Sequence, residues 1–153
     1  MRAFPILVLS CAVAVFAGSS NAQGADSFIQ VQDAWARQAP MMPPMGHMHA
    51  AGGNGAVYMS LRNTGQETDA LVGGSSDAAE SVELHETMRE GDVMRMRPVT
   101  KLEVPAGGVL EMKPGGLHVM LINLKRDLRP GDRIHVTLTF ERGAPVSLEV
   151  PVR

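Results

Sequence analysis

The chain has 153 residues, of which 44% are hydrophobic and 20% are charged, and its formal net charge is -2. A chain of this size can bury a core without disulfide bonds, and its composition predicts one mildly acidic domain. With no basic stripe in the sequence, we expect no nucleic-acid partner, and we expect a monomer.

The first 22 residues have the pattern of a cleaved secretory signal peptide. Arg2 supplies a positive charge, residues 6–17 form an apolar stretch shorter than a membrane span, and small residues precede Gln23. We therefore expect residues 23–153 to form the mature domain, located in the periplasm. The alternatives are an uncleaved membrane anchor and a lipoprotein attached through Cys11, although that cysteine comes early for a lipoprotein signal.

The soft metal ligands that the mature chain can offer are methionine and histidine side chains, because it contains no cysteine. The only cysteine lies in the signal peptide, so the mature chain has no thiol and no disulfide. In an oxidising compartment, thiolate ligands risk oxidation, whereas thioethers and imidazoles remain usable. The eleven methionines of the full chain, ten of which follow the signal peptide, are therefore the feature to explain.

Short runs of β-branched and apolar residues, separated mostly by turns rich in glycine, proline and asparagine, predict ten strands. No run with helical periodicity and caps follows the signal peptide. Even spacing of short strands predicts an all-β sandwich or barrel. The predicted strands are residues 28–37, 56–63, 70–72, 82–88, 93–97, 102–104, 109–112, 117–124, 134–140 and 146–152.

Alternation within these strands separates core residues from candidate ligands. Residues 134–140 alternate cleanly, which places His135 on the solvent face, where we do not expect a ligand. In the strand over 56–63, Met59 shares a face with the aliphatic residues and is expected in the core. Tyr58 lies on the opposite face of that strand.

The predicted strand over 117–124 gives the strongest geometric argument. Its aliphatic residues point to the core, so His118 and Met120 share the other face, about 6.6 Å apart along the strand. Their side chains can therefore converge on one ion. His85 lies on the face opposite Leu84, whereas strand geometry leaves the direction of Met96 open.

Thioether and imidazole donors favour a soft ion, and Cu(I) fits best. The thioethers disfavour zinc, and the lack of a carboxylate cluster argues against calcium or magnesium. Taken singly, however, a methionine in a β-protein is more often a core residue than a ligand.

The spacing of four residues resembles a family signature. Ten, twenty-one and one residues separate His85, Met96, His118 and Met120 in turn. This pattern is similar to that of the periplasmic copper chaperone family called PCuAC. The surrounding sequence also looks like the family from residue 35 to 150, above all in residues 82–86, 91–97, 110–121 and 128–132.

The resemblance implies a cupredoxin-like Greek-key β-fold with Cu(I) held at the surface by His85, Met96, His118 and Met120. It also implies delivery of copper to the binuclear copper A centre in subunit II of cytochrome c oxidase, often alongside a thioredoxin-like copper chaperone.

We expect no enzyme, since no nucleophile and base can be paired. A blue-copper protein would need a cysteine thiolate. Periplasmic copper buffering or resistance is the alternative function.

A segment over residues 40–55, rich in methionine, histidine, proline and glycine, interrupts the strand pattern. Some PCuAC proteins carry such a segment after the last strand, whereas here it follows the first one. Our hypothesis is a weaker auxiliary site for loading copper or for Cu(II), and the alternative is a loop without metal. Its candidate ligands are Met41, Met42, Met45, His47, Met48 and His49.

Deletion of residues 41–49 tests the auxiliary site. If these thioethers and imidazoles bind copper, the deletion lowers the number of copper ions bound per chain while the tight site remains. The measurement is a copper titration of the mature protein with and without the segment. An unchanged stoichiometry would rule the auxiliary site out.

Overall fold

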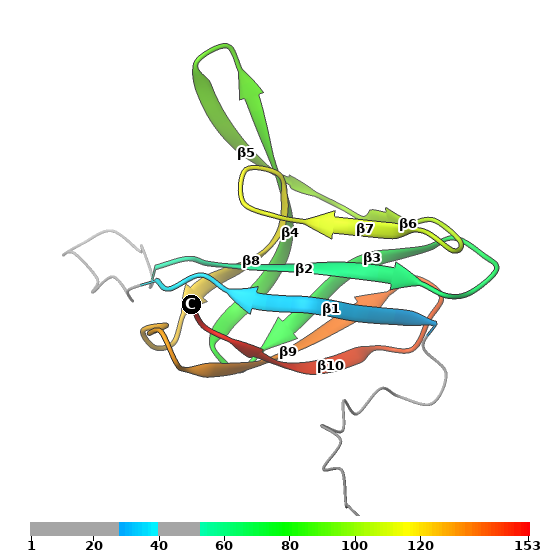
Figure 1. The fold of residues 1–153 in the computed structure, drawn as a ribbon. Helices are drawn as coiled ribbons and strands as arrows, with labels where there is room; N and C mark the ends of the chain where they lie inside the picture. The colour runs from blue at the N-terminus through cyan, green and yellow to red at the C-terminus, as the bar shows by residue number, and fades with distance from the viewer. Residues whose placement is uncertain (1–27, 40–52) are drawn as a thin grey trace, which may run out of the picture.

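The computed structural model describes residues 28–39 and 53–153 (Figure 1). The predicted signal peptide and the six candidate auxiliary ligands lie outside these residues, so both stay predictions. Within the described ranges there is no helix long and apolar enough to cross a membrane.

All ten predicted strands are present, and the all-β prediction is confirmed. The third and fourth strands extend further than the sequence indicated, because Gly73, Gly74 and several polar residues continue them. The strands are β1 (Ile29–Ala36), β2 (Gly55–Asn63), β3 (Asp69–Ser76), β4 (Ala79–Glu90), β5 (Val93–Val99), β6 (Leu102–Val104), β7 (Val109–Met112), β8 (Leu117–Leu124), β9 (Arg133–Phe140) and β10 (Val146–Pro151).

The strands form one curved sheet in the order β1-β2-β8-β4-β3-β9-β10, with β5, β6 and β7 paired to β4, β3 and β2. The two ends of this order meet again, since the backbone N–H of Gln38 donates to the carbonyl of Arg153 at 2.9 Å. A bridge between Ala36 and Val152 lies beside that bond. The sheet is therefore a nearly closed barrel (Figure 1).

The barrel interior holds the residues that alternation assigned to the core. Ile134, Val136 and Leu138 of β9 are fully buried, and so is Met59 of β2, as predicted. Tyr58 departs from the simple alternation: it points away from this interior, yet it is only 6% exposed. Trp35 of β1 packs on it, with ring centroids 4.8 Å apart.

The β4–β5 hairpin extends beyond the barrel (Figure 1). Residues 84–86 of β4 pair with both β5 and β8, whereas residues 87–90 pair with β5. The hairpin closes between Glu90 and Val93, where Gly91 takes the positive φ of 62° that a tight two-residue turn needs. Most residues of the projecting part are exposed.

Two substitutions on β8 test this division into an inner and an outer face. Leu121→Ala removes a fully buried side chain and should lower the free energy of unfolding by about 2–5 kcal/mol. Met120→Ala, at a partly exposed position, should cost clearly less. Urea denaturation of the metal-free domain measures both losses, and equal losses would contradict the assignment of faces.

Candidate metal centre

Strand register places the four sequence-predicted ligands on one face of the sheet. His85 of β4 lies directly opposite His118 of β8, and Glu83 lies opposite Met120. Directly opposed residues of antiparallel strands point to the same side, as do residues two apart on a strand. His85, His118 and Met120 therefore share the outer face of the barrel.

Met96 joins the same face through the hairpin. It lies opposite Thr87, which is two residues from His85 on β4 and therefore on the same side of that strand. Its side chain is 61% exposed, so the direction that the sequence left open is outward. The register thus brings together residues that are far apart in the sequence.

A hollow of about 490 Å³ lies over this face. It is lined by residues of β2, β4, β5 and β8 and by residues that follow β1 or precede β2 and β8. The lining residues are Arg37, Gln38, Ala39, Asn54, Gly55, Ala56, Tyr58, Thr87, Met94, Met96, Pro114, Gly115, His118 and Met120.

One ring nitrogen of His118 is hydrogen-bonded, and the other keeps a lone pair that can bind a metal. Its Nδ1 lies 3.0 Å from the carbonyl oxygen of Gly116. A carbonyl only accepts, so Nδ1 carries the proton and Nε2 is the nitrogen that can bind a metal. The residue as a whole is only 2% exposed, so its side chain lies beneath the surface of this face. Tyr58 lies beside it, with ring centroids 6.1 Å apart.

His85 shows the complementary arrangement. Its Nε2 lies 2.9 Å from Oε2 of Glu83, and because a carboxylate only accepts, Nε2 carries the proton. The other nitrogen, Nδ1, is buried and has no hydrogen-bond partner. An unpaired buried polar atom costs free energy, and a metal ion bound to its lone pair would remove that cost. The two imidazole centroids are 5.8 Å apart.

The donor set suits a soft ion and little else. In residues 28–39 and 53–153, no group of three or more His, Cys, Asp or Glu side chains is placed to hold a metal. Two neutral imidazoles and two thioethers, one of them on Met96 and one on Met120, are typical of Cu(I) sites. The fit therefore depends on sulfur donors that do not require deprotonation.

Sequence reasoning missed Glu83, Tyr58 and Trp35 as parts of the site. Together with the histidines, the two aromatic residues form a row across β1, β2, β8 and β4, because Trp35 pairs with Tyr58 and His118 with His85. The single available signal was the placement of Glu83 two residues before His85, which puts both on one face.

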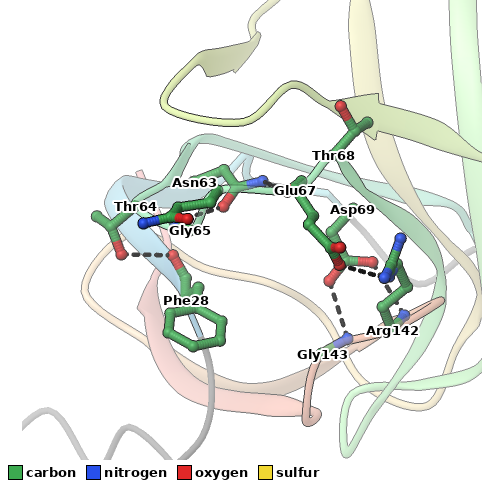
Figure 2. A pocket seen from close by; sticks show the side chains of 10 residues that line it. Phe28, Asn63, Thr64, Gly65, Glu67, Thr68, Asp69, Arg142 and Gly143 are labelled. Atoms are coloured by element: carbon green, nitrogen blue, oxygen red, sulfur yellow. Dashed lines mark hydrogen bonds and ion pairs between the residues drawn. The ribbon is translucent and has the colours of Figure 1, made fainter.

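A larger hollow, of about 650 Å³, lies at the other end of β2 and contains no histidine or methionine among its lining residues (Figure 2). Its acidic groups are engaged in structural contacts. Asp69 accepts hydrogen bonds from the backbone N–H groups of Arg142 and Gly143 at 3.0 and 2.9 Å, and Glu67 pairs with the Arg142 side chain. These contacts hold the β2–β3 and β9–β10 loops together, so the two carboxylates have a structural role.

Comparison with solved structures identifies the fold. The copper-bound PCuAC domain from PmoF2 matches with a TM-score of 0.64 and 24% identity, over 86% of this chain and 97% of that domain. The solution structure of Cu(I)-DR1885 from Deinococcus radiodurans matches with a TM-score of 0.57 and 31% identity, over 80% and 78% of the two chains. The chain has the PCuAC domain fold, and the predicted cupredoxin-like β-barrel is confirmed.

The chain belongs to the LpqE-like family, whose model, described as "Putative lipoprotein LpqE-like", matches residues 29–152. Together with the matches to PCuAC domains, this family assignment confirms the resemblance to the PCuAC family seen in the sequence. The "Putative lipoprotein Lxx21020" of Leifsonia xyli subsp. xyli is 34% identical over 94% of this chain and 80% of its own length. The uncharacterized protein RP573 of Rickettsia prowazekii is 31% identical over 86% and 68%.

Histidine tautomers in the metal-free protein test the geometry of the site. At a pH where both rings are neutral, long-range ¹H–¹⁵N spectra should show the proton on Nδ1 of His118 and on Nε2 of His85. Glu83→Ala should abolish the preference at His85, because the carboxylate that accepts from Nε2 is lost.

Glu86→Ala is the matched control for that variant. Glu86 lies on the other face of β4, where it pairs with Arg97, so its removal should leave both tautomers unchanged. If both variants shift His85 alike, or neither does, then Glu83 does not orient the ring.

Proposed function

We propose that this chain is an exported copper chaperone that binds Cu(I) through His85, Met96, His118 and Met120. One observation carries the proposal: the buried, unpartnered Nδ1 of His85 lies on the face that also presents His118, Met96 and Met120. The relative from Deinococcus radiodurans, described as a Cu(I) form, supports the choice of ion.

Copper is cargo in this proposal, and the exposure of the ligands suits its transfer. The two imidazoles are largely buried, whereas Met96 stands on the projecting hairpin in contact with solvent. A thioether is uncharged and needs no deprotonation, so a partner can displace it without a proton-transfer step. We therefore propose that a copper-accepting protein replaces Met96 first and the histidines last.

The proposed acceptor is the copper A centre of cytochrome c oxidase, reached directly or through a thioredoxin-like copper chaperone. We propose that the domain acts as a binding protein and not as an enzyme. We also propose a periplasmic location after cleavage before Gln23. The lipoprotein descriptions of the family model and of the relative from Leifsonia xyli support export and make attachment through Cys11 the alternative. The mass of the purified N-terminal peptide separates cleavage before Gln23 from attachment through Cys11.

Removal of one predicted ligand tests Cu(I) binding. His118→Ala should weaken Cu(I) binding about 100-fold or more, equivalent to about 2.7 kcal/mol, in competition with a chromophoric Cu(I) chelator. His135→Ala is the matched control, because it removes an exposed histidine on β9, a strand that β3 separates from β4 and the site. Equal affinities for the wild type and His118→Ala would contradict the ligand set.

Delivery is tested separately in cells of the source organism that lack the gene. With limiting copper, such cells should lose cytochrome c oxidase activity, and wild-type protein but not the His118→Ala variant should restore it. Copper sensitivity with normal oxidase activity would contradict delivery and favour the alternative, copper buffering or resistance.

A further inference from the structure

The two faces of the projecting β4–β5 hairpin differ sharply in chemistry. On one face, Arg97 pairs with Glu86 at 2.9 Å and Arg95 with Glu90 at 3.0 Å, so its charges neutralise one another. Met88, opposite Arg95, belongs to this face too. This face of the hairpin therefore carries paired charges, and we call it the ionic face.

That other face carries two methionines in succession. Met94 and Met96 are two residues apart on β5, so both point to the side that bears His85. Met94 is 56% exposed and lines the same hollow as Met96, His118 and Met120. It is the one thioether of that hollow that the four-residue signature leaves without a role.

The side chain of Arg89, which lies opposite Met94, does not cover the Met94 thioether. Arg89 lies across from Met94, but its Nε donates to the Gly91 carbonyl at 2.9 Å and its guanidinium lies 3.8 Å from Asp92. The arginine is thus held at the hairpin turn. The thioether of Met94 stays accessible both to solvent and to the hollow.

We infer that Met94 is a third thioether ligand, which holds Cu(I) together with Met96 while the ion enters or leaves the histidines. The inference rests on the proposed Cu(I) function. A bond from copper to the sulfur of Met94 forms as a bond to a histidine nitrogen breaks, and that nitrogen keeps its lone pair. Copper stays Cu(I), and no proton moves because a thioether is neutral.

This assignment gives the ion an ordered route. The imidazoles lie deepest, Met120 is partly exposed, and Met96 and Met94 are exposed on a strand that reaches past the barrel. Residues two apart on a strand lie about 6.6 Å apart, so two long thioether side chains can meet at one ion. An acceptor approaching the hairpin would then meet copper on sulfur before it meets any histidine.

Methyl NMR tests the contact directly in the intact mature protein. With ¹³C-methyl methionine and anaerobic Cu(I) titration, the methyl signal of Met94 should move together with those of Met96 and Met120. The methyl of Met88 is the internal control, since it is 38% exposed on the ionic face of the same hairpin and should not move.

Affinity of an outer site gives a second readout. In a His85→Ala, His118→Ala background, the Cu(I) binding that remains should fall about tenfold on Met94→Leu and stay within about twofold on Met88→Leu. Both methionines are exposed, so leucine at either position leaves the fold intact, and the NMR experiment does not need the histidine variants to fold.

The outcomes separate the two hypotheses. If the wild type does not bind Cu(I), the proposed function fails and this inference fails with it. If the wild type binds Cu(I) through His118 but the Met94 methyl does not move and Met94→Leu behaves like Met88→Leu, only the inference about Met94 is overturned.

Discussion

The register between β4 and β8 is the constraint on which the site depends. It sets His85 directly opposite His118, and it carries Glu83 and Met120 to the same face one step along. A slip of one residue would turn one of these strands over and bury its ligands in the barrel. Leu84, which precedes His85, and Val119, which lies between His118 and Met120, prevent that slip because both fill the core.

The same face combines rigid and accessible donors. His118 is held by the Gly116 carbonyl and lies beside Tyr58, and His85 is held by Glu83, so each imidazole keeps one defined nitrogen available. The thioethers, by contrast, come from a partly exposed strand and from a hairpin that stands clear of the barrel. Under the proposed function, a site built this way would bind a soft ion through fixed groups and release it through groups that a partner can reach.

Much of this arrangement could be predicted from the sequence, because alternation is a local property. It assigned Met59 to the core and His118 and Met120 to the outer face, and turn residues gave the positions of all ten strands. Pairing between strands is not local, so the sequence left the direction of the Met96 side chain open. The register between β4 and β5 decides it. Burial of Tyr58 was missed for the same reason, since it depends on Trp35 and on the register shift in β1 that precedes it.

X-ray absorption at the copper edge of the Cu(I)-loaded mature protein tests the central claim most directly. With residues 41–49 deleted to remove other thioethers, the account predicts a mixed shell of imidazole nitrogen and thioether sulfur, with the nitrogen contribution reduced in the His118→Ala variant. A shell of sulfur alone, or one that His118→Ala leaves unchanged, would contradict it.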